Sequence, residues 1–121
     1  MAPFPLSRMR RMAFVHLRAH TEFSVVDGTL RIDDAVAAAA ADGQGALAIT
    51  DHDNLYGAME YAKAAIERGL KPITGCELTI HPAGDDHRPA ESHLTVLCES
   101  VEGYRNLCRL VTDAHVDGYY Y

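Results

Sequence analysis

Short apolar runs alternate with helix-type segments along this chain, and that alternation is the strongest constraint on its fold. Four apolar runs are suited to buried strands, at 13–17, 46–50, 71–80 and 93–98. Three further segments have helix-forming composition or spacing, at 32–42, 55–68 and 101–115. The resulting order of strand, helix, strand, helix, strand, strand and helix predicts an α/β architecture with mainly parallel strands.

The composition is that of one soluble globular domain. Of the 121 residues, 48% are hydrophobic and 23% charged, and no apolar run approaches the roughly 18 to 20 residues of a membrane helix. Residues 1–12 are interpreted as a flexible basic arm without a secretory signal, which predicts a cytoplasmic protein. The net charge of −6 argues against this segment gripping a nucleic-acid backbone by itself.

Three cysteines, Cys76, Cys98 and Cys108, are present. They show no Cys-x-x-Cys spacing, so the sequence predicts neither a disulfide framework nor a thiolate zinc site. We expect all three to be buried as small apolar residues.

Polar side chains follow three of the predicted strands, where the strands end. The loop after the first strand carries His20 and Asp27, the second strand runs into Asp51-His52-Asp53, and Glu77 lies in the third. Because the carboxyl ends of parallel strands meet at one edge of a sheet, these side chains can share a site. Imidazole and carboxylate ligands suit zinc, manganese or iron. Asp53 has an alternative role, which is to cap the following helix together with Asn54.

Four stretches of the chain carry a resemblance to a known family, in matching order and spacing. They are 14–28, 48–57, 69–77, and 93–98 with 102–107. They resemble the polymerase-and-histidinol-phosphatase (PHP) domain found at the amino terminus of bacterial DNA polymerase III alpha subunits. The resemblance implies a distorted seven-stranded β/α barrel, of which residues 13–121 would be the amino-terminal, incomplete portion.

Active members of this family hold two or three metal ions at the strand ends and hydrolyse phosphoester bonds. Carried over by motif, the resemblance implies five metal ligands in this chain: His20, Asp27, His52, Glu77 and His93. Zinc or manganese is the expected metal. Asp51 is a candidate for a residue that orients a ligand histidine.

One position departs from the family pattern, because Arg18 replaces the first histidine of its His-x-His motif. Arginine stays protonated and has no lone pair for a metal, so one metal position is expected to be lost. His16 is considered as a shifted ligand. His81, His87 and His115 are expected to be surface or helix-end histidines.

The resemblance therefore predicts part of a DNA-directed DNA polymerase, with this domain serving as a structural and subunit-docking module that keeps a partial metal site. Its expected partners are a proofreading exonuclease subunit and other replicase subunits. DNA and magnesium would be bound by the parent polymerase outside this segment. Two alternatives remain: an active phosphoesterase, either a proofreading 3'-5' exonuclease or a pyrophosphatase, and a free-standing enzyme of the histidinol-phosphatase type. An unclosed barrel is also expected to associate in isolation, because it exposes strand edge and apolar surface.

Overall fold

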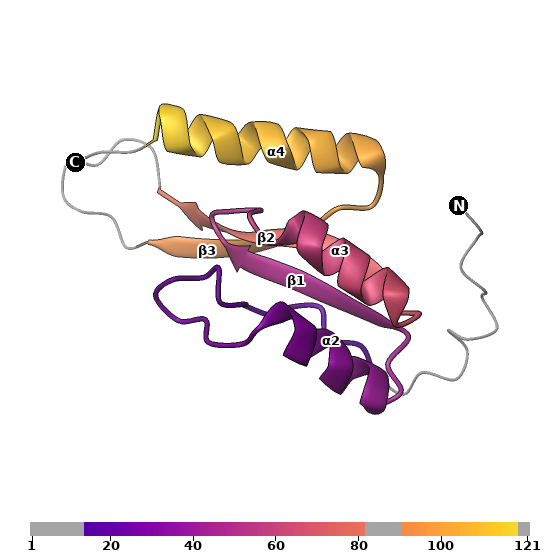
Figure 1. Ribbon diagram of the computed structural model, residues 1–121. Coiled ribbons are helices and arrows are strands. Elements are labelled where there is room, and N and C mark those ends of the chain that lie inside the picture. Colours follow the sequence, from indigo (N-terminus) through magenta and orange to yellow (C-terminus); the bar gives the residue numbers. More distant parts are fainter. Residues whose placement is uncertain (1–13, 82–90, 119–121) are drawn as a thin grey trace.

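The computed structural model describes residues 14–81 and 91–118 (Figure 1). The predicted basic arm and His87 lie outside the described residues. The elements are, in chain order, α2 (Ile32–Ala41), β1 (Ala46–His52), α3 (Ala58–Glu67), β2 (Lys71–Ile80), β3 (Ser92–Leu97) and α4 (Val101–Val116). The predicted helix at 32–42 and the strands at 46–50, 71–80 and 93–98 are confirmed to within a few residues.

The sheet has the order β1-β2-β3. β1 and β2 pair in parallel, from Ala46 opposite Lys71 to His52 opposite Glu77. β3 is antiparallel to β2, so the expectation of mainly parallel strands holds for only one of the two pairings. The reason is the length of the connection: β2 ends at Ile80 and β3 begins at Ser92, whereas a crossover to a parallel neighbouring strand needs about a dozen residues or more.

The strand predicted at 13–17 does not form over its described part, residues 14–17, although this segment lies beside β1. The β1 amides of Ala48 and Thr50 donate to the carbonyls of His16 and Ala19, at 2.9 and 2.8 Å. The reciprocal donors go to side chains instead: the His16 amide to Gln44 Oε1 at 3.3 Å, and the Ala19 amide to Thr50 Oγ1 at 3.1 Å. A regular ladder is therefore replaced by a side-chain-anchored extended segment at residues 14–20.

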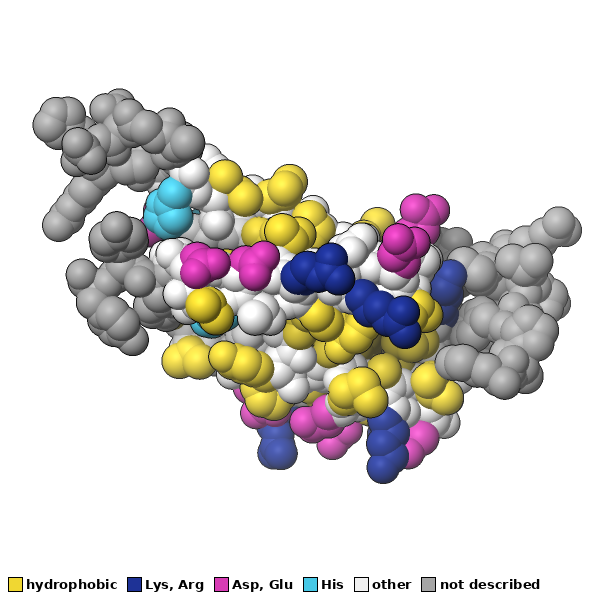
Figure 2. Space-filling model, turned by 90° about the horizontal axis from the view of Figure 1, so that it is seen from above, with side chains coloured by type: hydrophobic (Ala, Val, Ile, Leu, Met, Phe, Trp, Pro, Cys, Tyr) yellow, Lys and Arg dark blue, Asp and Glu magenta, His cyan; other side chains and the backbone are white. Residues whose placement is uncertain are grey.

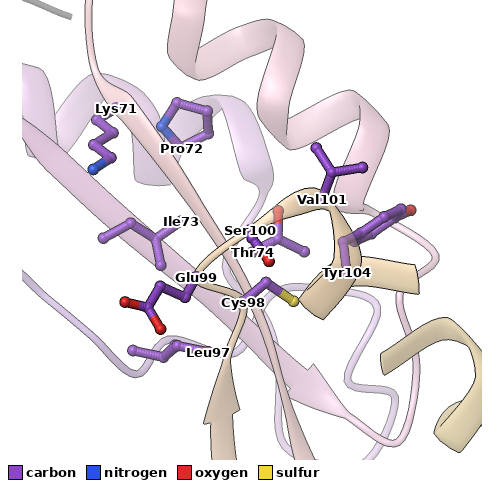
Figure 3. A pocket seen from close by; sticks show the side chains of 10 residues that line it. All are labelled: Lys71, Pro72, Ile73, Thr74, Leu97, Cys98, Glu99, Ser100, Val101 and Tyr104. Carbon is purple, nitrogen blue, oxygen red and sulfur yellow. The ribbon is translucent and has the colours of Figure 1, made fainter. Parts of the chain in front are cut away.

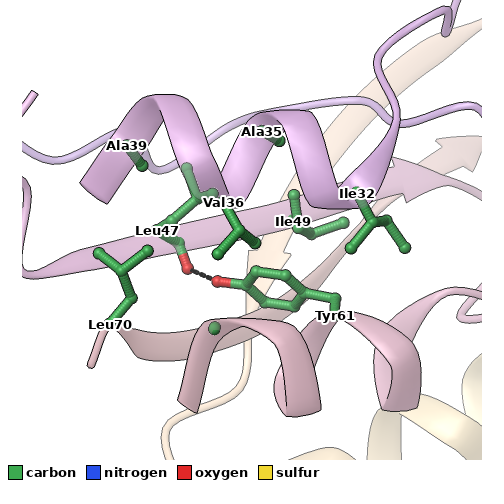
Figure 4. Packing of buried hydrophobic residues seen from close by; sticks show 9 residues of the cluster. Ile32, Ala35, Val36, Ala39, Leu47, Ile49, Tyr61 and Leu70 are labelled. Carbon is green, nitrogen blue, oxygen red and sulfur yellow. Dashed lines mark hydrogen bonds between the residues drawn. The ribbon is translucent and has the colours of Figure 1, made fainter. Parts of the chain in front are cut away.

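The hydrophobic core lies where α2 and α3 pack against β1 (Figure 4). Alternate β1 residues Leu47 and Ile49 enter it, as expected for a strand, and Val36 of α2 is fully buried there. Tyr61 of α3 is also fully buried, and its hydroxyl donates to the Leu47 carbonyl. Burial raises the pKa of Tyr61 to about 12.

Helix α3 presents a different face to the core from the one predicted. The predicted apolar stripe includes Met59 and Ile66, yet these side chains are 76% and 51% exposed. The buried positions are Ala58, Tyr61 and Ala65. The pattern of large aliphatic residues was misleading because the Tyr61 hydroxyl finds a carbonyl partner in the core, which lets its ring be buried. The helix also begins at Ala58 rather than at residue 55.

Helix α4 lies on the other side of the sheet from α2 in the view of Figure 1. The Ser100 hydroxyl caps its first turn by accepting from the Gly103 amide at 3.1 Å. Of its predicted stripe, Leu107 is buried, whereas Val101 is exposed. Figure 2 shows apolar side chains interspersed with charged ones on the face seen from above.

The cysteines follow the prediction only in part. All three are free, but Cys76 alone is buried, and Cys98 and Cys108 are half-buried.

Within residues 14–81 and 91–118, no helix is long and apolar enough to cross a membrane.

The buried hydrogen bond from Tyr61 to Leu47 predicts that removing the tyrosine hydroxyl lowers the stability of the fold. Tyr61→Phe leaves the ring in place but removes the donor to Leu47, so we expect a loss of about 1 kcal/mol in the free energy of unfolding. Tyr56→Phe is the matched control, because Tyr56 is 71% exposed, and its change should stay within about 0.5 kcal/mol. Chemical denaturation measures both, and equal effects of the two substitutions would contradict the packing described.

Candidate metal centre

The register of the sheet gathers polar side chains at one end. Because β1 and β2 are parallel, the last residue of β1, His52, lies directly opposite Glu77. β3 runs the other way, so its second residue, His93, lies opposite Thr79 near the same end. His20, the last residue of the 14–20 segment, and Asp27, in the loop that follows it, also lie at this edge.

Three of the five predicted ligands form a compact group, which we call the histidine–carboxylate group: His20, His52 and Glu77. Their ligand atoms lie within 4.8 Å of one another. Glu77 is buried and the two histidines are half-buried, with ring centroids 4.3 Å apart. His20 Nε2 also contacts the Glu77 carboxylate directly.

Asp27 bridges the two histidines of this group. Its Oδ2 lies 3.2 Å from His20 Nδ1 and 3.1 Å from His52 Nε2. Although partial desolvation opposes it, the combined effect of the two imidazoles lowers the pKa of Asp27 below its ordinary value. Asp27 thus adds a second carboxylate beside the group.

His93 is placed at the edge of the site rather than inside it. Its ring packs against His52, with centroids 5.3 Å apart, but it does not belong to the histidine–carboxylate group. His16 lines a separate cavity of about 400 Å³ beside α2, so it does not replace the missing ligand. His81 is exposed, and His115 on α4 lies 2.7 Å from the Asp53 carbonyl oxygen.

Arg18 makes a two-point ion pair with Glu77. Its Nη2 donates to Glu77 Oε1 at 2.9 Å, and its Nε donates to Oε2 at 3.1 Å. The arginine hydrogen bonds are the largest cause that holds the Glu77 pKa at about 2; burial opposes them, and contact with His20 adds to them. The fixed positive charge expected from the sequence at position 18 is thus placed directly on a predicted ligand.

Asp51 organises the loop that carries the ligands. Its buried carboxylate accepts from the Thr21 amide at 2.6 Å, and from the hydroxyls of Thr21 and Ser24 at 2.8 Å each. The Ser24 hydroxyl in turn accepts from the His52 amide at 3.1 Å. Asp51 therefore acts on His52 through Ser24 and the backbone, and its carboxylate is occupied by the 21–24 turn.

The same loop closes tightly at Gly28. The Gly28 amide donates to the Ser24 carbonyl at 2.7 Å, and a Cβ atom at this position would lie 1.7 Å from the Thr21 carbonyl oxygen. Only glycine fits there. The adjacent Asp27 is thereby directed back towards the histidines.

The alternative of Asp53 as a helix cap is wrong. The N-cap of α3 is Gly57, and Asp53 instead binds Thr79, accepting from its amide at 2.8 Å and its hydroxyl at 2.7 Å. The backbone of Asp53 adopts a φ of 52°, which aspartate tolerates better than most residues. Thr79, together with Thr21 and Ser24, was missed by the sequence analysis, because hydroxyl residues in strands and turns carry no metal-ligand signal.

A larger groove lies at the other end of β2. It has a volume of about 540 Å³ and is formed by the start of β2, the end of β3 and the start of α4 (Figure 3). Lys71, Leu97 and Tyr104 are among its lining residues. It is separate from the histidine–carboxylate group and holds none of the predicted site residues.

The donor chemistry of the histidine–carboxylate group fits one divalent ion. Two imidazoles and a carboxylate are a common ligand set for zinc and for other transition metals. The second carboxylate of Asp27 would add negative charge. Arg18 is the feature that does not fit, because it already neutralises Glu77.

Fold and site together define an α/β domain with a candidate metal site at the end of its parallel strand pair. The PHP domain family model matches residues 16–121. The chain therefore belongs to the PHP domain family.

Its relatives are bacterial DNA polymerases. The error-prone DNA polymerase of Symbiobacterium thermophilum is 46% identical over 105 residues, which is 87% of this chain and 9% of that protein. The DNA polymerase III subunit alpha of Chlamydia pneumoniae is 40% identical over 116 residues, 91% of this chain and 9% of that protein. That of Treponema pallidum is 40% identical over 119 residues, 93% of this chain and 10% of that protein. The chain thus spans about a tenth of the length of these relatives.

Two solved structures share the fold. An amidohydrolase from Chromobacterium violaceum, with sulfate and no metal, gives a TM-score of 0.53 at 24% identity, over 82% of this chain and 33% of that one. A protein from Bifidobacterium adolescentis, inferred to be a metal-dependent phosphoesterase, gives 0.57 at 27% identity, over 81% and 33%. The predicted fold class, an incomplete portion of a β/α barrel, is confirmed.

Asp51 provides a test of how the site is positioned. The two oxygens of Asp51 together accept three hydrogen bonds, and Asp51→Asn replaces one of these oxygens with an amide donor, so we expect a loss of about 1–3 kcal/mol in the free energy of unfolding. Asp113→Asn on exposed α4 is the control and should change it by less than about 0.5 kcal/mol. If denaturation curves show Asp51→Asn to be as stable as the control, the positioning role is wrong.

The ion pair predicts a particular pH dependence. The Glu77 pKa is about 2 in the folded protein against 4.5 ordinarily, so its ionised form stabilises the fold fully above about pH 4.5. This contribution is lost as the pH falls from about 4.5 towards about 2. We expect Glu77→Gln to flatten the curve of unfolding free energy against pH in this window, whereas the exposed control Glu22→Gln leaves it unchanged. Parallel curves for wild type and Glu77→Gln would contradict the assignment.

Proposed function

We propose that this chain is the PHP portion of a bacterial DNA-directed DNA polymerase of the DNA polymerase III alpha subunit type. The observation that carries the proposal is the 40–46% identity to such polymerases over 87–93% of the chain. Nucleotide transfer and its magnesium site would belong to parts of the polymerase outside this segment. The length of these relatives favours this assignment over a free-standing enzyme of the histidinol-phosphatase type.

Within the polymerase, the domain serves as a structural and docking module. It would contact a proofreading exonuclease subunit and other replicase subunits in the cytoplasm, and DNA would be held by the parent protein. The Arg18–Glu77 ion pair supports a structural role, because it ties the 14–20 segment to β2 without a metal ion. The net charge of −6 agrees with DNA being gripped elsewhere.

The domain keeps a partial metal site. His20, His52 and Glu77 would hold one zinc or manganese ion, with Asp27 and His93 next to it. A bound ion would supply Lewis-acid chemistry towards a phosphoester. Asp51 would keep the ligand loop in place through Thr21 and Ser24.

The second candidate is an active phosphoesterase, working as a proofreading exonuclease or a pyrophosphatase. The compact histidine–carboxylate group favours it, as does the likeness to the protein from Bifidobacterium adolescentis. Arg18 argues against it, because a fixed cation on Glu77 opposes the two-ion arrangement that such hydrolysis commonly uses.

The two functions are distinguished in the full-length polymerase polypeptide, purified without chelator. We expect primer extension with magnesium and deoxynucleotides, and no release of nucleotides from the 3' end or cleavage of pyrophosphate. His52→Ala removes a proposed ligand, and His81→Ala, an exposed histidine, is the matched control. Absence of primer extension would contradict the polymerase assignment. A hydrolytic activity that His52→Ala abolishes and His81→Ala retains would establish the second candidate.

A further inference from the structure

Arg18 and His20 both reach the Glu77 carboxylate from the same extended segment. Arg18 Nη2 donates a hydrogen bond to Glu77 Oε1. Glu77 Oε2 accepts from Arg18 Nε and also contacts His20 Nε2. A planar guanidinium matches a carboxylate in this two-point geometry better than a lysine ammonium does. Both Glu77 oxygens are therefore engaged by cationic or donor groups of the chain itself.

The side chains around Glu77 have the charge distribution of a cation-binding site. Asp27 and Glu77 are two carboxylates next to two imidazoles, and a further positive charge stabilises carboxylates held this close together. Arg18 supplies that charge in the structure. Because like charges repel in a partly buried site, the same guanidinium opposes a divalent ion at the adjacent ligand atoms.

The arginine is able to leave its position without repacking the core. Its side chain is 61% exposed, whereas that of Glu77 is only 5% exposed. The guanidinium therefore approaches the carboxylate from the solvent side. The positions of the two histidines and of Glu77 are fixed by the sheet register and by the loop that Asp51 anchors, and not by Arg18.

We propose that Arg18 and a divalent cation are alternative partners of the Glu77 carboxylate, with Arg18 acting as a built-in cation that stabilises the site when metal is absent and lowers its affinity for metal. This inference rests on the proposed assignment of His20, His52 and Glu77 as the metal ligands. Its consequence is that removing the arginine converts a weak metal site into a stronger one that depends on metal for its stability.

The test measures zinc binding to the chelator-treated full-length polypeptide by calorimetry. Arg18→Gln removes the charge, and Arg18→His supplies a further imidazole, so either variant serves if the other folds poorly. We expect zinc to bind at least about tenfold more tightly to these variants than to wild type. Arg105→Gln, an exposed arginine on α4, is the matched control and should bind zinc as wild type does. Thermal unfolding gives a second readout: Arg18→Gln should melt below wild type without metal and regain stability with zinc.

The outcomes separate this inference from the proposed metal site. If wild type and both Arg18 variants bind zinc equally well, the inference is overturned and the metal site stands. If none of them binds zinc, the inference and the metal site both fail, while the polymerase assignment is still judged by primer extension. If zinc stabilises wild type as strongly as Arg18→Gln, the competition between Arg18 and metal is likewise refuted.

Discussion

Parallel pairing of β1 with β2 puts His52 opposite Glu77, and the rest of the polar edge is arranged around that pair. β1 is buried along almost its whole length, so its register is held by the core that Leu47 and Ile49 share with α2 and α3. A shift of one residue would turn both side chains out of the core and move His52 away from Glu77. The stability of the core and the geometry of the site therefore depend on the same register.

Two interactions extend this pairing to the part of the chain that precedes β1. The buried carboxylate of Asp51 fixes the 21–24 turn, and the Arg18–Glu77 ion pair fixes the segment before it. The segment makes few backbone hydrogen bonds to β1, so these side-chain contacts provide much of its attachment. A PHP domain built in this way uses residues at the ligand positions as structural ties.

The sequence predicted three of the strands and the gathering of polar side chains at the ends of β1 and β2, because apolar runs followed by polar residues are local signals. It did not predict which residues from other parts of the chain serve as hydrogen-bond partners of these segments. The segment at 14–20 looked like a strand, but Gln44 and Thr50 take its donors. Tyr61 is buried because Leu47, which is distant in sequence, offers a carbonyl.

The same limit applied to the candidate ligands. Arg18 was identified as a departure from the family pattern, yet its contact with Glu77 depends on a separation of 59 residues that no local pattern contains. Asp51 near the end of β1 and Asp53 just after it both have hydroxyl partners, one in the preceding loop and one on β2. Residues two apart in a strand point to the same face, so alternation does not separate these two roles; the chain leaves the strand after His52, and Asp53 adopts a φ of 52°.

Mutual exclusion of Arg18 and metal at Glu77 is the central claim, and anomalous X-ray diffraction tests it most directly. Crystals of the wild-type protein would be soaked in zinc and measured at the zinc absorption edge. We predict that any zinc peak between His20, His52 and Glu77 appears only where the Arg18 guanidinium has left the carboxylate. A fully occupied zinc ion bound to Glu77, with Arg18 still donating both hydrogen bonds, would contradict the account.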